Sequence, residues 1–347
     1  MNTTIALFLT QDGLTNGAIY ALLALALVMV FSVTRVILVP QGDLVTYAAF
    51  TLASFKAGVL PGTLWLLTIG GLVVAAMDLY AYARGPRSAA RLRSAALYAL
   101  YPAAIVAALH AIDVGALPYL AQILLTLLAV VPFGPIMYRA VFQHVENASV
   151  LVLLIVAVAV HIAMLGLALF FFGPEGVRTT PIVTGRIAVA GVSISAQVIF
   201  VTAVSLVLVA ALFWFFRTTI AGKALRATAF NRTGARLVGI STSSAGVMAF
   251  LLAGLIGTVS GILVAPITTI YYDTGFLIGL KGFIAAIVGG LVSYPLAAIG
   301  ALGLGLMESF SAFVWSSYKD VIVFALIIPI LIWRSLVDRH PVEDEEE

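Results

Sequence analysis

Long, uninterrupted apolar runs leave this chain few possible architectures. A helix needs about 20 consecutive apolar residues to cross the bilayer core, and an outer-membrane barrel would instead show alternating residues. The sequence therefore predicts an all-α, polytopic transmembrane helical bundle of about 9–11 membrane segments. The runs lie at Leu14–Val33, Leu44–Leu60, Leu64–Tyr82, Ala95–His110, Leu117–Met137, Ala148–Phe172, Ile194–Phe216, Ala245–Val264, Phe276–Leu291, Leu296–Val314 and Val321–Trp333.

Two places in this pattern predict something other than a simple crossing. The run Phe276–Leu291 is short and glycine-rich, which is compatible with a broken or re-entrant helix. The stretch Val36–Gln41, with Pro40 and the following Gly42, is compatible with a break in the helix inside the membrane.

The charged residues exclude several other classes of protein. Only 18 Lys or Arg and 15 Asp or Glu occur in 347 residues, or 10%, whereas soluble domains contain about 25%. A soluble globular enzyme is excluded, because a water-facing surface of this size cannot be built from so few charges. Disorder is excluded by the 63% hydrophobic content. No stretch concentrates basic charge with exposed aromatic residues, so we expect no nucleic-acid binding.

Two basic connections predict the orientation. Residues 84–93 contain four arginines and residues 217–240 contain five basic groups, and neither stretch contains an acidic residue. Both are predicted to be cytoplasmic, and the four crossings between them return the chain to the same side. Counting outward places the N-terminus outside and the C-terminus in the cytoplasm. We expect one transmembrane domain, 1–334, with a cytoplasmic loop at 217–244, followed by an acidic cytoplasmic tail, 335–347.

The chain carries no recognisable catalytic or nucleotide-binding motif. It has no G-x-x-x-x-G-K-[ST] phosphate loop, so any ATP hydrolysis must be performed by a partner. There are no cysteines, and the four histidines show no metal-ligand spacing. His161 lies in an apolar run and is predicted to be a packed, hydrogen-bonded residue rather than a ligand.

Ionisable residues inside the membrane are functional candidates, because burying one is energetically unfavourable. Asp43 follows the Pro40 break, and Glu308 lies late in the penultimate run. Both can alternatively cap or pin helices. Two isolated acids provide weak support for a carrier driven by protons or sodium.

The basic connection 217–240 is long for this chain and rich in alanine. Gly222 and Gly239 are predicted helix ends, and a break is expected at Gly234, because glycine inside a helix costs about 1 kcal/mol relative to alanine. A short helix outside the bilayer can dock onto a cytoplasmic partner or rest on anionic lipid. Composition leaves both possibilities open.

Four motifs follow one another along the chain. The first, in NGAIYALLALALVMVFSVTRVILVPQGDL, comprises Gly17, Tyr20, Ala21, Leu22, Ala24, Leu27, Arg35, Gly42 and Asp43. The second, in the basic connection, comprises Gly222, Ala224, Arg226, Ala227, Ala229, Asn231, Ala235, Gly239 and Ile240. The third, in DTGFLIGLKGFIAAIVGGL, comprises Gly275, Gly279, Lys281, Phe283, Ala285, Ala286, Gly289 and Gly290. The fourth combines Glu308 with Tyr318, Lys319, Asp320 and Phe324.

In order and spacing these motifs resemble those of the permease subunits of branched-chain amino acid ABC importers, the high-affinity leucine, isoleucine and valine permease family. The resemblance covers most of the chain except roughly 63–117, where an extra hairpin of about two helices is expected, and the tail. The chain departs from the family pattern at Gln41, where the family often has His. It also departs at Phe230, where the family has an acidic residue or Gln.

The resemblance implies a type II-like ABC importer permease in the plasma membrane. Such a permease pairs with a second homologous permease subunit, docks onto two ABC ATPase subunits and receives substrate from an extracytoplasmic solute-binding protein. ATP and Mg²⁺ bind the ATPase partners, and no cofactor is expected in this chain. The chain is therefore predicted to be a transporter subunit and not an enzyme.

The resemblance also implies two groups of functional residues. Lys281 is expected near the outer mouth, where it meets the binding protein or extends to lipid headgroups. Arg226, Arg232 and Arg236 are expected to pair with acidic groups of the ATPase. The predicted ATPase-coupling residues are Gly222, Lys223, Arg226, Ala227, Asn231, Arg232, Ala235, Arg236 and Gly239, and the predicted translocation-path residues are Gln41, Gly42, Asp43, Lys281 and Glu308.

Three alternative functions remain at this point. A urea or short-amide ABC permease shares the same motifs. An ion-coupled secondary carrier and a membrane scaffold without transport activity are different classes of protein.

Overall fold

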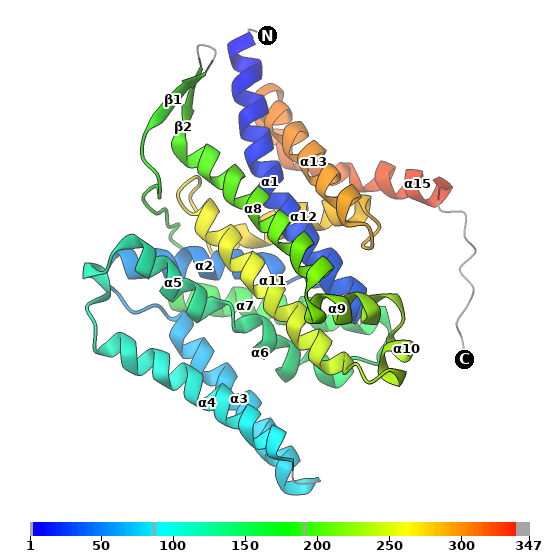
Figure 1. Cartoon of the computed structure of the whole chain (residues 1–347). Coiled ribbons are helices and arrows are strands. Elements are labelled where there is room, and N and C mark those ends of the chain that lie inside the picture. Colours follow the sequence, from blue (N-terminus) through cyan, green and yellow to red (C-terminus); the bar gives the residue numbers. More distant parts are fainter. Residues whose placement is uncertain (1–2, 86–87, 190–191, 338–347) are drawn as a thin grey trace.

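The computed structural model describes residues 3–85, 88–189 and 192–337 of the chain, and Figure 1 shows its arrangement. The acidic tail, predicted at 335–347, lies largely outside the described residues, and the division of the chain into permease domain and tail stays a prediction. The helices are α1 Thr3–Thr34, α2 Gln41–Lys56, α3 Thr63–Arg84, α4 Ala89–His110, α5 Tyr119–Val130, α6 Phe133–Ala140, α7 Val150–Phe172, α8 Ala196–Thr218, α9 Ile220–Phe230, α10 Arg232–Leu237, α11 Thr242–Val264, α12 Thr274–Val288, α13 Tyr294–Val314, α14 Lys319–Ala325 and α15 Ile327–Val337. Three 3₁₀ helices, η1 Val114–Ala116, η2 Phe142–Val145 and η3 Ser316–Tyr318, and two strands, β1 Arg186–Val189 and β2 Val192–Ser195, complete it.

The predicted polytopic helical bundle is confirmed. Within the described residues, nine helical segments are long and apolar enough to cross a membrane, so the chain is a multi-pass membrane protein. They are Thr4–Thr34, Thr63–Arg84, Ala89–His110, Tyr119–Val145, Val150–Phe172, Ala196–Thr218, Thr242–Val264, Tyr294–Val314 and Ser316–Trp333.

Two shorter helices, α2 and α12, lie inside the bundle. The run predicted to cross at Leu44–Leu60 is in fact a 16-residue helix that ends at Lys56, because the chain turns at Gly58, which has φ +72°. Most of the run Phe276–Leu291 lies in α12, a continuous helix of 15 residues that ends at Val288, so the prediction of a broken helix was wrong, whereas a re-entrant helix stays a prediction. At about 1.5 Å per residue, each helix is shorter than the hydrocarbon core.

Glycine lets these short helices approach their neighbours closely. A Cβ atom added at Gly42 in α2 would collide with the carbonyl of Gly275 in α12. A Cβ at Gly261 in α11 would collide with the carbonyl of Val45 in α2. The helices α2, α11 and α12 therefore cross backbone to backbone, which small residues permit in membranes.

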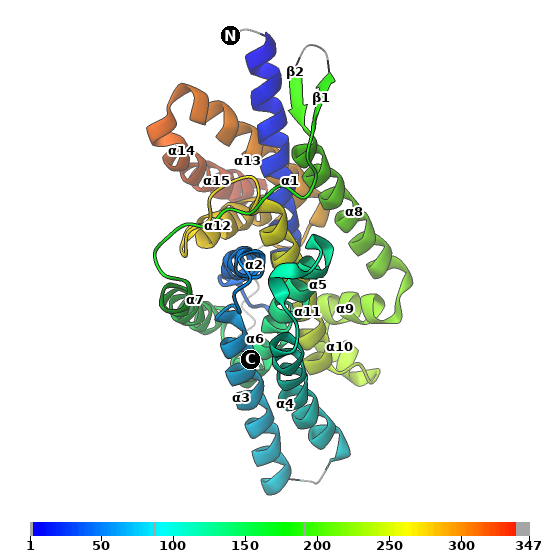
Figure 2. The same cartoon turned by 90° about the vertical axis from the view of Figure 1, so that its left-hand side faces the viewer.

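The long helix α1 lies at the centre of the bundle and packs against α11, α12 and α13 (Figures 1 and 2). Its residues from Ala18 to Val30 are almost entirely buried. A Cβ at Gly17 would lie 2.9 Å from the Cα of Leu302, so α13 also packs closely on α1. The break that the sequence indicated directly follows this buried part of α1.

Two hairpins extend from the bundle. The α3–α4 pair projects at the bottom of both views, and the β1–β2 hairpin lies at the top with the start of α1 (Figures 1 and 2). The β-hairpin was not predicted. It pairs Arg186 with Ser195 and Ile187 with Ile194 in antiparallel register.

Candidate functional site

The predicted coupling segment folds as two short helices, α9 and α10. Thr219 caps α9 by accepting a 2.9 Å hydrogen bond from the Gly222 amide. Asn231 ends α9 in an extended conformation and caps α10 by accepting a 2.8 Å bond from the Gly234 amide. The break is therefore at Asn231, and the prediction of a break at Gly234 was wrong. A capping side chain satisfies an otherwise unpaired amide, which outweighs the helix propensity of one glycine.

The two glycines expected at the helix ends play different roles. Gly222 lies inside α9, where a Cβ atom would collide with the carbonyl of Phe215, so its small size folds α9 tightly back against α8. The prediction that Gly222 marks a helix end was therefore wrong. Gly239 follows α10 with φ +84°, a conformation that favours glycine, and its position as a helix end is confirmed.

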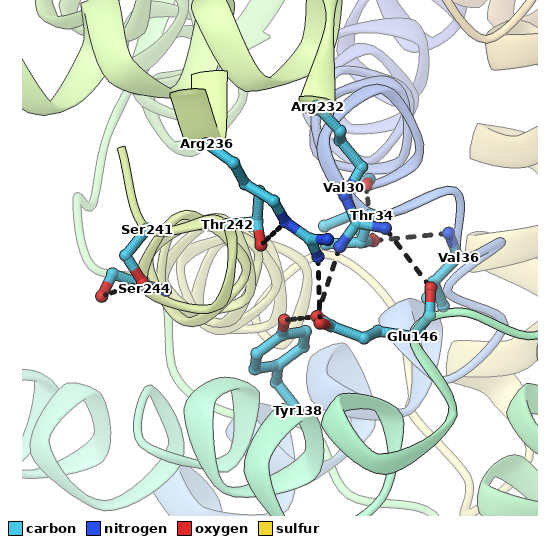
Figure 3. Close-up of polar contacts among 10 residues, drawn as sticks. All are labelled: Val30, Thr34, Val36, Tyr138, Glu146, Arg232, Arg236, Ser241, Thr242 and Ser244. Atoms are coloured by element: carbon cyan, nitrogen blue, oxygen red, sulfur yellow. Dashed lines mark hydrogen bonds and ion pairs between the residues drawn. The ribbon is translucent and has the colours of Figure 1, made fainter. Parts of the chain in front are cut away.

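Glu146, in the turn between η2 and α7, attaches α10 to the bundle (Figure 3). Its carboxylate accepts hydrogen bonds from Arg232 at 3.2 Å, from Arg236 at 3.4 Å and from the Tyr138 hydroxyl at 3.1 Å. Arg236 also donates to Thr242 at the start of α11 at 3.1 Å. Arg232 and Arg236 are thus paired within the chain, which differs from the expectation that they are available to a partner.

The outer surface of the coupling segment presents large apolar side chains. Phe230 is 95% exposed, Leu237 84% and Val238 75%, whereas Ala227 is partly buried and Ala235 is buried. Large apolar side chains with this exposure mark an interaction surface. We call Phe230, Leu237 and Val238 the apolar tip.

The break predicted between α1 and α2 is present. The helix α1 ends at Thr34, residues 35–38 are non-helical, residues 39 and 40 form a turn, and α2 begins at Gln41 inside the protein. Gln41 donates a 3.0 Å hydrogen bond to the Ala253 carbonyl of α11, while its Oε1 has no partner among the described residues. A buried amide oxygen normally accepts a hydrogen bond, so the break presents an acceptor to a ligand that carries a donor group.

Asp43 is hydrogen-bonded to His161 of α7. Nδ1 of His161 lies 2.8 and 3.0 Å from the two carboxylate oxygens, and both side chains are buried. The imidazole stacks on Phe276 of α12, with ring centroids 4.4 Å apart. His161 is therefore the packed, hydrogen-bonded residue that was predicted. Among the described residues, no group of three or more His, Cys, Asp or Glu side chains could hold a metal ion.

A cavity of about 250 Å³ lies beside this pair. Its wall includes Leu38 and Val39 of the break, Val158 and His161 of α7, and Phe276 of α12. Gln41, Gly42 and Asp43 do not contribute to the lining of this cavity but lie behind it, and Asp43 acts on it through His161. Such a site, apolar with one polar group, is typical of small-ligand pockets.

Lys281 and Glu308 meet in a second buried cluster. Nζ of Lys281 lies 2.5 Å from a carboxylate oxygen of Glu308 and 3.1 Å from one of Asp320. The Tyr20 hydroxyl donates to the other Glu308 oxygen at 2.6 Å. Lys281 is only 7% exposed, so it neither lies free at an outer mouth nor extends to headgroups. The cluster joins α1, α12, α13 and α14.

Several of these partners were missed by sequence reasoning. Glu146 and Tyr138 lie in no recognised motif, and Arg139, which pairs with Asp78 of α3 at 2.7 Å, was not singled out. For the Lys281 cluster a signal was available, because Tyr20, Lys281, Glu308 and Asp320 each lie in one of the four motifs. Ionisable residues in membrane helices usually pair with one another, so these four could have been expected to meet.

Comparison with known proteins adds an independent observation. Residues 90–331 match the family described as "Branched-chain amino acid transport system / permease component". The protein LivH of Escherichia coli K12, a high-affinity branched-chain amino acid transport system permease protein, is 26% identical over 337 residues, which cover 94% of this chain and 93% of that protein. BraD of Pseudomonas aeruginosa is 28% identical over 256 residues, 71% of this chain and 83% of that protein.

A third organism provides another relative. The probable branched-chain amino acid transport permease protein LivH of Methanocaldococcus jannaschii is 29% identical over 229 residues, 63% of this chain and 71% of that protein. No solved structure gives a significant match. Because the family match spans most of the chain, the resemblance based on the four motifs is confirmed, and the chain belongs to the family of branched-chain amino acid transport system permease components.

Proposed function

We propose that this chain carries branched-chain amino acids across the cytoplasmic membrane as one of two permease subunits of an ABC importer. The observation that carries the proposal is the similarity to a permease of this kind along 94% of the chain. Two ATPase subunits bind ATP and Mg²⁺ and supply the energy, and an external binding protein delivers the amino acid. The permease itself contains no cofactor.

The family assignment decides among the functions left open by the sequence. It supports the importer permease over the urea permease, the ion-coupled carrier and the scaffold. The family consists of transport components, so the chain is a transport subunit and not an enzyme.

The α9–α10 segment is the proposed contact with the ATPase. The apolar tip, Phe230, Leu237 and Val238, inserts into an apolar groove of the partner, and the exposed Lys223 pairs with an acidic group beside it. Because Glu146 joins α10 to Tyr138 of α6, movement of the ATPase is transmitted directly to a membrane helix. A paired and capped segment transmits force better than a free loop.

The proposed translocation path passes the break between α1 and α2. Its cavity of about 250 Å³ offers aliphatic walls for a branched side chain, and His161 is its polar group. The buried N-terminus of α2, at Gln41 and Gly42, lies behind the wall of this cavity, as interrupted helices lie at the substrate sites of other transporters. Tight binding is unnecessary, because the binding protein selects the substrate.

We propose that α9 and α10 face the cytoplasm and that the start of α1 faces outward. Arg217, Lys223 and Arg226 lie on or next to α9, in agreement with the excess of basic residues in cytoplasmic loops. In both views the β1–β2 hairpin lies beside the start of α1 and away from α9 and α10.

Uptake of labelled leucine, isoleucine, valine and urea in a deletion strain tests the function. Uptake of the three amino acids should require both this chain and the ATPase genes, and urea uptake should require neither. The variant Leu237→Asp should lower amino acid uptake by about tenfold or more, because it places a charge in the apolar contact. Leu237→Met keeps an apolar side chain and is the matched control. Normal ATP-dependent uptake by Leu237→Asp, at equal amounts in the membrane, would contradict the docking role.

A further inference from the structure

A large groove lies between α8 and the centre of the bundle, away from the cavity at the α1–α2 break. Its volume is about 540 Å³, within the range of cavities that hold a ligand. Its walls are apolar side chains of α1, α8, α11 and α13, among them Met29, Leu212 and Ala298. The rings of Phe216 and Tyr294, 5.7 Å apart, connect α8 to α13 at one end.

Two arginines line this otherwise apolar groove. Arg217 lies in the last turn of α8, and Arg226 lies on α9. Both line the groove because Gly222 allows α9 to fold back against Phe215 and Phe216. Both residues are also exposed, so their apolar stems contribute to the groove wall and their guanidinium groups lie at its rim.

Neither arginine is neutralised by the described residues. Arg232 and Arg236, on the next helix, share the carboxylate of Glu146. Within residues 3–85, 88–189 and 192–337, Arg217 and Arg226 form no ion pair and no hydrogen bond through their side chains. Two unpaired cations at the rim of one apolar groove are complementary to a molecule with an anionic head and an apolar chain.

The position of Arg217 matches the level of the lipid headgroups. The helix α8 has 23 residues and is long enough to cross the hydrocarbon core, which is about 30 Å thick. A residue in its last turn lies at the membrane surface, where phosphate groups lie. Guanidinium groups bind phosphate through paired, charge-assisted hydrogen bonds, and basic pockets between membrane helices bind anionic headgroups.

We propose that this groove binds an anionic phospholipid, with an acyl chain along Met29, Leu212 and Ala298 and the phosphate between Arg217 and Arg226. The lipid supplies the countercharge that the described residues lack, and it joins α8 and α9 to α13. A neutral helix of another subunit would cover the apolar walls but would leave both guanidinium groups unpaired beside it.

Lipid retention by the purified transporter complex tests this proposal without measuring transport, so its result does not depend on the proposed function. The complex is reconstituted in nanodiscs of phosphatidylglycerol and phosphatidylcholine with identical acyl chains, re-extracted in mild detergent, and the retained lipid is measured by mass spectrometry. We expect the wild type to favour phosphatidylglycerol by about tenfold or more, since each of the two basic groups near a membrane surface contributes about fivefold.

Three variants separate the two parts of the site. Arg217→Gln with Arg226→Gln should abolish the preference and leave retention of the neutral lipid unchanged. Ala298→Trp, which fills the groove and keeps both arginines, should reduce retention of both lipids. Arg93→Gln with Lys223→Gln removes two exposed cations outside the groove and should preserve the preference. The proposal is overturned if the wild type retains both lipids equally, or if the Arg93 and Lys223 variant loses the preference as the Arg217 and Arg226 variant does. It is also overturned if Ala298→Trp releases the second permease while lipid retention is unchanged.

Discussion

Removing one member of the Lys281–Glu308 pair should destabilise the bundle more than removing both. The two side chains are 8% and 10% exposed and lie 2.5 Å apart. Removing one partner of a buried pair leaves an uncompensated charge in an apolar region, which typically costs about 3–5 kcal/mol. Replacing both members by neutral groups removes that penalty.

The neighbouring contacts set the expected size of each effect. Glu308→Gln leaves Lys281 with Asp320, which is 45% exposed, so we expect a loss of about 3 kcal/mol. Lys281→Met leaves Glu308 with only the Tyr20 hydroxyl, and we expect about the same loss. The double variant retains an amide oxygen that accepts from Tyr20, and Asp320 can be hydrated, so we expect about 2 kcal/mol. The two single variants together should lose about 6 kcal/mol and the double variant about 2 kcal/mol. The difference, the coupling energy of the pair, lies within the range measured for close charge pairs.

The free energy of unfolding can be measured by titrating the detergent-solubilised protein with sodium dodecyl sulfate and following helicity by circular dichroism. Arg236→Gln is the control, because its side chain is 51% exposed and its ion pair with Glu146 should contribute about 0–1 kcal/mol. If the double variant loses as much stability as the two single variants together, the charge-pair reasoning is refuted.

Three further predictions concern the packing, the coupling segment and the cavity. Gly42→Ala should lower the free energy of unfolding by about 3 kcal/mol or more, because its Cβ collides with the Gly275 carbonyl. Gly303→Ala is the control and should be neutral or slightly stabilising, because no atom lies within 4 Å of the added Cβ. Equal losses of stability in the two variants would contradict the packing argument. Glu146→Ala should release α10 and raise hydrogen exchange of its amides by about tenfold or more relative to α11, because the bond to the largely buried Arg232, which contributes about 1.5–3 kcal/mol, is lost. Unchanged exchange would show that Glu146 is not the anchor. Val158→Phe narrows the cavity of about 250 Å³ and should reduce uptake of leucine about tenfold more than uptake of valine, because leucine has one more methylene group. An equal loss for both amino acids would place the translocation path elsewhere.

The features that the sequence predicted are those with local causes. Apolar runs predicted most membrane helices, and Pro40 with Gly42 indicated the break before α2. The end of α10 at Gly239 follows from the conformational freedom of glycine, which acts within one turn. Each of these signals lies within a few residues of the structure it determines.

The errors also have physical causes. The break at Asn231 was assigned to Gly234 because helix propensity was considered without the capping bond that joins these two residues. The pairs Arg232–Glu146 and His161–Asp43 join residues 86 and 118 positions apart. Which helices meet depends on packing of the whole bundle, so no single stretch of sequence identifies these partners.

The buried acids bear on the energy source. Asp43 pairs with His161, Asp78 with Arg139 and Glu308 with Lys281, each within 2.8 Å. A carboxylate that carries protons or sodium through a membrane must exchange its partner during transport, whereas each of these three is held by a cation or imidazole and joins separate helices. The small number of acidic residues in the membrane segments was the first argument against ion coupling. The pairing of these three acids strengthens that argument. The pairs fasten the bundle, and the exposed apolar tip on α9 and α10 offers a route by which an external ATPase can move it.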